Sequence, residues 1–108
     1  MKRFMLLFVG LAAQPQATDD ETKSYNQLWG TWIGGLAQRG ILESGSPLEF
    51  AGKVVAKDSV SEFQPERVDI GGFLLIKTAS MDEAVEIAGQ APHIALGGTT
   101  IVRACMQQ

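Results

Sequence analysis

Uninterrupted apolar character distinguishes two stretches of the chain, residues 4–9 (FMLLFV) and residues 73–76 (FLLI). A strand with one face in water alternates apolar and polar side chains, whereas a strand covered on both faces does not. Both stretches are therefore predicted to be buried strands at the centre of a sheet.

Two further β regions are predicted from weaker patterns. Residues 41–47 lead into the first of them, which is expected to centre on residues 53–56, with Gly52 as a turn or bulge. Residues 57–66 are polar and are predicted to be irregular. The last strand is expected over residues 99–105.

A helical repeat follows the first apolar stretch. Thr18 with Glu21 three positions later predicts an N-terminal capping box, and Gly40 predicts a left-handed C-terminal cap. Between them, six side chains recur at spacings that place them on one helix face, and these are Tyr25, Leu28, Trp29, Trp32, Ile33 and Leu36. Three glycines interrupt this helix and are expected to let another backbone approach closely: Gly30, Gly34 and Gly35.

A second, shorter helix is predicted after residue 80. Ser80 and Glu83 have the spacing of another capping box, and the helix is expected to end near Gly89. Its buried stripe is predicted to consist of Met81, Ala84, Val85 and Ala88. Beyond it, the Gly97-Gly98 pair is expected to turn the chain into the last strand.

The order of these elements is β-α-β-β-α-β over a single domain, residues 1–108. This order is typical of the α+β class, specifically a ferredoxin-like antiparallel sheet with two helices on one face. Two helices cover only one face, yet both central strands are apolar on both faces. A second copy of the chain, related by a two-fold axis, is the simplest cover for the other face, so we predict a homodimer.

Composition and charge restrict the partners and cofactors. The net charge is −3, the isoelectric point is near 5.0, and the nine basic residues are scattered. A nucleic-acid-binding protein normally gathers Lys and Arg on one face, so nucleic acid is not expected as a partner. One Cys and one His allow neither an internal disulfide nor a zinc or haem ligand set within one chain. No metal and no cofactor are therefore expected, although a carboxylate site for a hard cation stays open.

The first residues permit two interpretations. Lys2 and Arg3 before an apolar run resemble the start of a secretory signal. The run is short, however, and Gly10 interrupts it, so a buried first strand is preferred and a cytoplasmic protein that keeps its N-terminus is predicted. No stretch of the sequence has the length needed to cross a bilayer, and no membrane association is expected.

Six segments together resemble the YCII-related family, in the branch named for an Asp-Gly-Pro-Phe motif. They are residues 2–8 (KRFMLLF), 29–32 (WGTW), 71–76 (GGFLLI), 80–88 (SMDEAVEIA), 91–93 (APH) and 97–103 (GGTTIVR). The resemblance implies a ferredoxin-like subunit that pairs sheet to sheet into a dimeric α+β barrel. In the enzyme-like branch of the family, a His on the inner face of the first helix works with an Asp.

Four residues are candidates for one small-molecule site between the first helix and the sheet. His93 is the only side chain whose ordinary pKa lies near neutrality, and it is the candidate general base or ligand anchor; as a plain loop residue it would instead bond a nearby carbonyl. Tyr25, Trp29 and Trp32 share a helix face, where they either line an aromatic pocket or pack in the core.

Two further candidates lie on strands. Ser46 falls near a strand end, where folds of this kind open their clefts, although ordinary turn chemistry also explains it. Arg103 alternates with Ile101 and Cys105 on the last strand, where its charge either pairs at the dimer contact, which we prefer, or reaches into a cleft.

The sequence leaves two functions open. In the first, the protein binds a small aromatic or carbonyl compound between the first helix and the sheet, with or without proton-transfer or lyase-type chemistry. The second is a non-catalytic accessory or interaction module. It is motivated by residues 60–63 (VSEF), where the family motif is reduced to its Phe, and by the absence of a His from the first helix.

Overall fold

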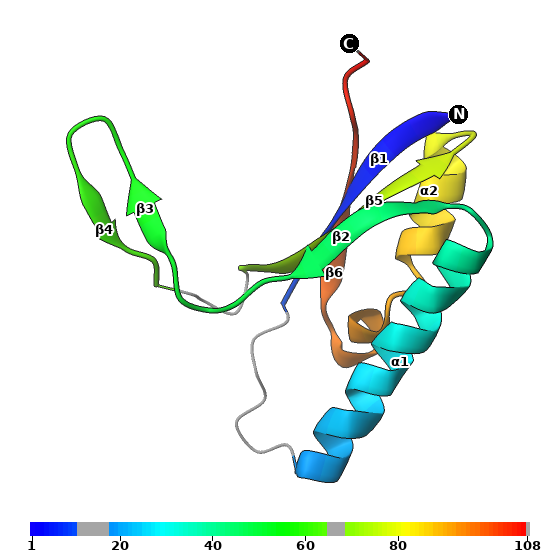
Figure 1. Cartoon of the computed structure of the whole chain (residues 1–108), viewed down its shortest axis with the longest axis horizontal. Coiled ribbons are helices and arrows are strands. Elements are labelled where there is room, and N and C mark those ends of the chain that lie inside the picture. Colours follow the sequence, from blue (N-terminus) through cyan, green and yellow to red (C-terminus); the bar gives the residue numbers. More distant parts are fainter. Residues whose placement is uncertain (11–17, 65–68, 108) are drawn as a thin grey trace.

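Four strands form one antiparallel sheet in the spatial order β2-β5-β1-β6, and two α-helices lie against one of its faces (Figure 1). The strands are β1 (Lys2–Val9), β2 (Leu42–Pro47), β5 (Ile70–Thr78) and β6 (Thr99–Ala104). The architecture comes from a computed structural model, which describes residues 1–10, 18–64 and 69–107. The α+β class and the ferredoxin-like order of the main elements agree with the prediction, with one extra hairpin between β2 and β5.

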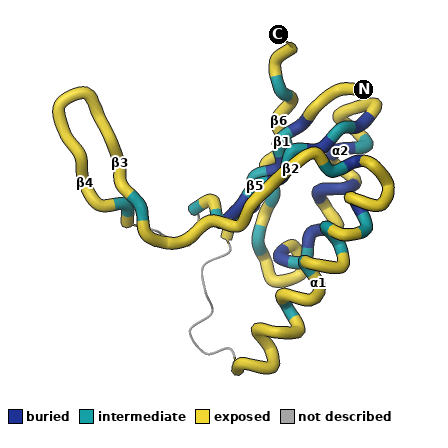
Figure 2. Tube along the Cα trace, viewed as in Figure 1, coloured by how far each residue is buried: buried dark blue, intermediate teal, exposed yellow. Residues whose placement is uncertain are grey.

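The two uninterrupted apolar stretches lie in the two central strands, as predicted. Leu6 of β1 and its partner Leu74 of β5 are buried beneath the helices. The next pair along, Leu7 and Phe73, points to the opposite face and is only half-buried. Figure 2 shows the buried residues gathered where the sheet meets the helices. The face without helices, centred on Met5, Leu7, Phe73 and Leu75, is called the open face below.

Helix α1 (Asp19–Gln38) begins and ends where its caps predict. The Thr18 hydroxyl accepts a hydrogen bond from the Glu21 N–H at 3.1 Å, and Gly40 adopts a left-handed φ of 72° just after the helix. Leu36 is its one buried residue, whereas Leu28 of the predicted face is 59% exposed.

The expectation that the helix glycines permit a close backbone approach is wrong within this chain. A Cβ added at Gly30, Gly34 or Gly35 would meet nothing within 4 Å.

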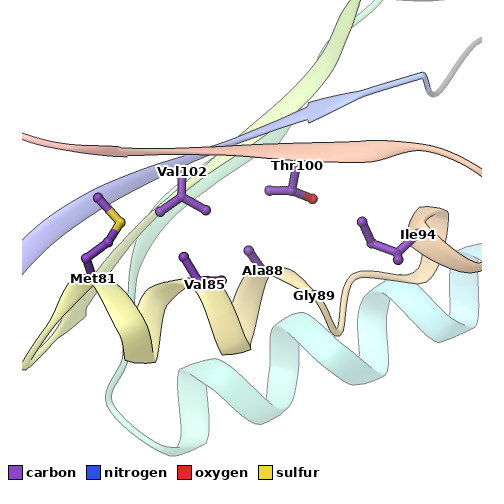
Figure 3. A pocket seen from close by; sticks show the side chains of 7 residues that line it. All are labelled: Met81, Val85, Ala88, Gly89, Ile94, Thr100 and Val102. Atoms are coloured by element: carbon purple, nitrogen blue, oxygen red, sulfur yellow. The ribbon is translucent and has the colours of Figure 1, made fainter.

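Helix α2 (Met81–Ala88) is capped by Ser80, whose hydroxyl accepts from the Glu83 N–H at 3.2 Å. The prediction of its buried stripe is partly wrong. Ala84 and Ala88 are buried, but Met81 and Val85 are 41% and 54% exposed, and Ile87 takes their place in the core. The buried face of α2 is therefore turned toward Ile87, which leaves Met81 and Val85 over an open groove beside β6 (Figure 3).

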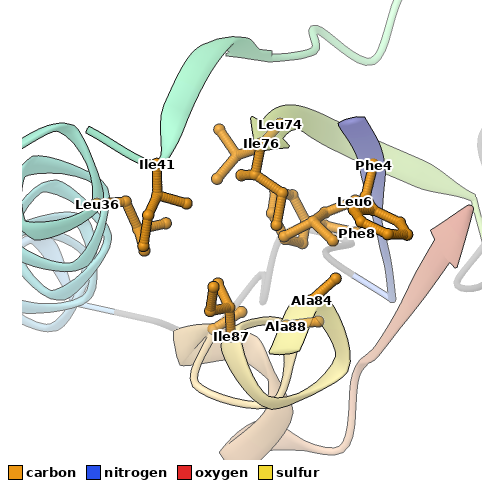
Figure 4. Close-up of a cluster of buried hydrophobic side chains, with 11 residues drawn as sticks. Phe4, Leu6, Phe8, Leu36, Ile41, Leu74, Ile76, Ala84, Ile87 and Ala88 are labelled. Carbon is orange, nitrogen blue, oxygen red and sulfur yellow. The ribbon is translucent and has the colours of Figure 1, made fainter. Parts of the chain in front are cut away.

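The core lies between the sheet and the helices, as Figure 4 shows. Its largest members come from the two central strands and are Phe4, Leu6, Phe8, Leu74 and Ile76. Helix α1 and the residue that follows its C-terminal cap add Leu36 and Ile41. Burying side chains of this size contributes roughly 1.5–3 kcal/mol each to folding, so this cluster accounts for the packing of helices on the sheet.

The second sheet strand lies earlier in the chain than predicted. The strand that pairs with β5 is β2, residues 42–47, and not residues 53–56. Its sequence, LESGSP, has no alternating apolar pattern, because it is an edge strand that is exposed over most of its length and is held by backbone pairing. Gly45 permits that pairing, since a Cβ there would lie 2.6 Å from the Phe73 carbonyl oxygen.

Residues 53–55 belong instead to a separate two-stranded hairpin. Strand β3 (Lys53–Val55) pairs with β4 (Val60–Glu62), so the prediction that residues 57–66 are irregular is wrong for β4, and residues 65 and 66 lie outside the described residues. The last helical element is a short 3₁₀-helix, η1 (Pro92–Leu96), which ends at Gly97 with a φ of 91°. Among the described residues, no helix is both long and apolar enough to span a membrane.

Candidate functional site

An aromatic cluster joins α1, β1 and η1. Phe8 of β1 lies at its centre, with ring centroids 5.0 Å from Trp29, 6.0 Å from Trp32 and 5.3 Å from His93. Tyr25 extends the cluster along α1 and meets Trp29 edge-on at 6.2 Å. The structure thus brings together the four residues that the sequence assigned to one site, and it adds Phe8.

The His93 ring is held by a stacking contact on one face and by a hydrogen bond at Nε2. It is 1% exposed and stacks on Trp29, with centroids 5.4 Å apart and planes at 27°. Its Nε2 lies 2.7 Å from the Thr99 carbonyl oxygen. A carbonyl oxygen only accepts hydrogen bonds, so Nε2 carries the proton in this contact. In the neutral imidazole, Nδ1 is then a bare lone pair.

Two polar atoms in this cluster are buried without a hydrogen-bond partner in the described structure, His93 Nδ1 and Trp32 Nε1. Buried polar atoms of this kind are uncommon, and leaving one unpaired costs about 1–3 kcal/mol. His93 Nδ1 accepts a proton or a hydrogen bond, whereas Trp32 Nε1 only donates one. The cluster therefore contains one unpaired acceptor and one unpaired donor within aromatic surroundings.

Gly98 sets the position of the imidazole. A Cβ at residue 98 would lie 2.5 Å from His93 Cδ2 and 2.9 Å from the Val9 carbonyl oxygen. The second glycine of the Gly97-Gly98 pair is thus required by a close approach, while the first supplies the left-handed turn.

Replacement of this glycine should displace the His93 ring. We expect Gly98→Ala to lower the free energy of unfolding by about 1–3 kcal/mol, because overpacking forces the neighbouring groups to shift. Gly34→Ala is the matched control, since open space surrounds residue 34 of α1 and alanine favours a helix by about 1 kcal/mol. Urea unfolding followed by tryptophan fluorescence measures both variants. Equal effects of the two substitutions would contradict the close approach at Gly98.

The remaining predicted site residues lie elsewhere. Ser46 pairs with Phe73 and Arg103 with Met5, so both side chains are on the open face, across the sheet from the aromatic cluster. The Ser46 hydroxyl donates to the Pro47 carbonyl oxygen at 2.8 Å, and Arg103 is exposed. Neither residue joins the cluster within one chain.

An open groove of about 390 Å³ adjoins the cluster, between α2 and β6 (Figure 3). Its walls are the apolar side chains of Met81, Val85, Ile94 and Val102, and Thr100 supplies a hydroxyl. That hydroxyl lies 3.3 Å from His93 Nε2, so Thr100 connects the groove to the buried imidazole. Within the described residues, no group of three or more His, Cys, Asp or Glu side chains is arranged to hold a metal ion.

Among solved structures, the chain is similar to a 5-chloro-2-hydroxyhydroquinone dehydrochlorinase from Burkholderia phenoliruptrix AC1100, in a complex with 2,5-dihydroxybenzoquinone. The two chains are 18% identical with a TM-score of 0.58, and the match covers 98% of this chain and 95% of that chain. At this identity the likeness shows the fold alone. No family model matches the chain, and no curated protein matches it significantly. Membership of the YCII-related family, and of its Asp-Gly-Pro-Phe branch, stays a prediction.

Two parts of the cluster were not apparent from the sequence. Phe8 was recognised only as a strand residue, although its alternation with Phe4 and Leu6 places it on the helix-facing side of β1. A bond from His93 to a nearby carbonyl was the predicted alternative to a site role, and the structure contains such a bond. Its partner, Thr99, was not apparent, because it depends on how η1 turns back onto β6.

Proposed function

We propose that the protein binds a small hydroxylated or carbonyl-bearing ring compound at the aromatic cluster and works as a homodimer. The observation that carries the binding proposal is the pair of buried, unpartnered polar atoms, His93 Nδ1 and Trp32 Nε1. A ligand hydroxyl satisfies the first by donating to it, and a ligand oxygen satisfies the second by accepting from it.

The aromatic side chains suit a flat ring. Trp29 meets both Phe8 and Tyr25 edge-on, and among the ring pairs of the described residues only Trp29 and His93 are stacked face to face. Trp29 is half-buried and stacks on the imidazole, so a ligand that bonds the Nδ1 edge of the ring is expected to displace the indole on entry. Binding should therefore change the tryptophan fluorescence.

The same arrangement supports proton transfer. A ligand enol O–H bond breaks and its proton forms a bond to Nδ1. The oxygen electron pair then forms a C=O bond, the ring C=C bond shifts by one position, and a leaving group on the neighbouring saturated ring carbon departs as an anion with its bonding pair. The imidazolium so formed keeps its Nε2–H on the Thr99 carbonyl. The dehydrochlorinase of similar fold acts on a hydroxylated, chlorinated ring, which supports this substrate class.

A non-catalytic module is the second candidate. It is favoured by the closure of the cluster, since His93 is only 1% exposed and is packed between two rings. The two candidates differ in whether any small molecule stabilises the chain.

A thermal-shift screen distinguishes them. We expect hydroxybenzoates, catechols and hydroxyquinones to stabilise the fold by about 2.7 kcal/mol at 100 times their dissociation constant, with methoxybenzenes, which lack the hydroxyl, as controls. Quinones alkylate thiols, so Cys105→Ser provides the background for that class. If no hydroxylated ring raises the melting temperature, the binding proposal fails and the accessory module is preferred.

The homodimer is supported by the open face. Its central side chains on β1 and β5 are apolar and half-buried in one chain, with Met5 opposite Leu75 and Leu7 opposite Phe73. The chain exposes 7841 Å², whereas a compact monomer of 11.6 kDa is expected to expose about 5800 Å². The excess of about 2000 Å² is comparable to one partner's share of an obligate interface.

A further inference from the structure

The β3–β4 hairpin extends away from the rest of the molecule. Residues 48–64, here called the arm, leave the sheet at the end of β2 and project past its edge, on the side away from the two helices (Figure 1). Figure 2 shows the arm exposed along nearly its whole length. The radius of gyration is 15.2 Å, against about 13 Å for a compact chain of this length.

The arm presents apolar side chains to solvent in a paired arrangement. Val55 and Val60 lie directly opposite each other across the hairpin and are 75% and 66% exposed. Val54, on the other side of the hairpin, is 48% exposed. An isolated two-stranded hairpin is marginally stable in water, and paired valines stabilise one chiefly when something packs against them.

The base of the arm is nonetheless fixed in place. The Phe63 N–H donates to the Gly52 carbonyl at 2.9 Å, and the Phe63 ring lies against the Gly52 backbone. The Leu48 N–H donates to the Gly71 carbonyl at 2.9 Å, which ties the arm to the start of β5. Lys53 and Glu62 form an ion pair across the first rung of the hairpin. The hairpin is therefore formed before any partner arrives, and such preorganisation reduces the entropy lost on association.

We propose that the arm clasps a second copy of this chain, with Val55 and Val60 packed on the partner. The proposal rests on the homodimer proposed above. A copy that covers the open face lies on the same side of the sheet as the arm. The arm then extends the open-face interface, and the partner covers Val55 and Val60, which are exposed within one chain.

Subunit exchange measures the contribution of the arm. Two populations carrying different fluorescent labels are mixed, and the exchange rate reports dimer dissociation. The double variant Val55→Thr/Val60→Thr keeps β-branched side chains and thus the hairpin preference, but it removes the apolar contact. We expect exchange to accelerate at least tenfold. Val85→Thr makes the same change at a 54% exposed position of α2, on the helix side of the sheet, and should leave the rate unchanged.

Hydrogen exchange provides the second measurement. The arm amides of Val54, Ser61 and Phe63, which lie at hydrogen-bonded positions of the hairpin, should be protected in the wild-type dimer and lose protection in a Leu75→Asp monomer, while β1 amides stay protected in both. Equal protection of the arm in dimer and monomer, or an unchanged exchange rate in the double variant, would overturn the clasp. A wild-type protein that sediments as a monomer would instead refute the homodimer itself.

Discussion

Leu75→Asp is expected to convert the homodimer into a folded monomer. Leu75 lies on a central strand, opposite Met5 and in the middle of the open face. A carboxylate there must either lose its hydration in an apolar contact or keep the two copies apart. Burying an unpaired charge costs about 3–5 kcal/mol, so the dissociation constant should rise by roughly two to four orders of magnitude.

Sedimentation equilibrium at low micromolar concentration tests this expectation. The wild type should sediment at twice the 11.6 kDa chain mass in both low and molar salt, because an apolar contact is not screened. Val85→Asp adds the same charge at an exposed position on the opposite side of the sheet and should remain dimeric. A wild-type species near 11.6 kDa in both buffers would show that the open face is not a dimer contact.

Long, strongly patterned elements were predictable from the sequence. The apolar runs in β1 and β5 have no polar alternation, which is the property of strands covered on both faces, and both are central strands. The caps were equally readable, since a hydroxyl at Thr18 or Ser80 bonds the N–H three residues later whatever the tertiary context. These signals are local, which is why they could be recognised without the fold.

The edge strand β2 was not predictable in the same way. Strand β2 is held by backbone pairing with β5, and its polar side chains carry no pattern. A β-bulge between Leu42 and Ser44 then reverses the alternation of the strand. It sends Ser44 and Ser46 to the open face, although a simple count from Leu42 would place them under the helices. Local counting cannot anticipate a bulge that long-range pairing creates.

The candidate site was likewise predictable only in part. The spacing of Tyr25, Trp29 and Trp32 on one helix face was sufficient to group them, and His93 was singled out by its chemistry. The stacking of His93 on Trp29 and the state of its two nitrogens depend on contacts between η1, β6 and α1. Those contacts join residues far apart in the chain, so the aromatic stripe was predictable while the bare lone pair on Nδ1 was not.

Two substitutions at His93 are expected to separate a binding role from a packing role. His93→Phe keeps a ring between Trp29 and Phe8 but removes both nitrogens. His93→Asn removes the ring but retains an oxygen acceptor close to the position of Nδ1. Both variants leave the Thr99 carbonyl without its present donor, so that loss, about 1–3 kcal/mol, is common to the pair. Any difference between the variants therefore reports ring packing or the Nδ1 acceptor.

If His93 has a binding role, the ranking of the two variants by affinity should be the reverse of their ranking by stability. His93→Phe should be the more stable of the two variants. His93→Asn also removes a ring from a well-packed core, which costs about 3–5 kcal/mol beyond the shared loss of the donor to Thr99. Affinity for a hydroxylated ring should favour His93→Asn, with the dissociation constant raised at least tenfold in His93→Phe, equivalent to about 1.4 kcal/mol. Calorimetric titration below both melting temperatures gives the affinities, and urea unfolding gives the stabilities. If affinity instead follows stability, with His93→Phe binding as well as the wild type, then His93 serves packing alone and the proton acceptor must be sought elsewhere.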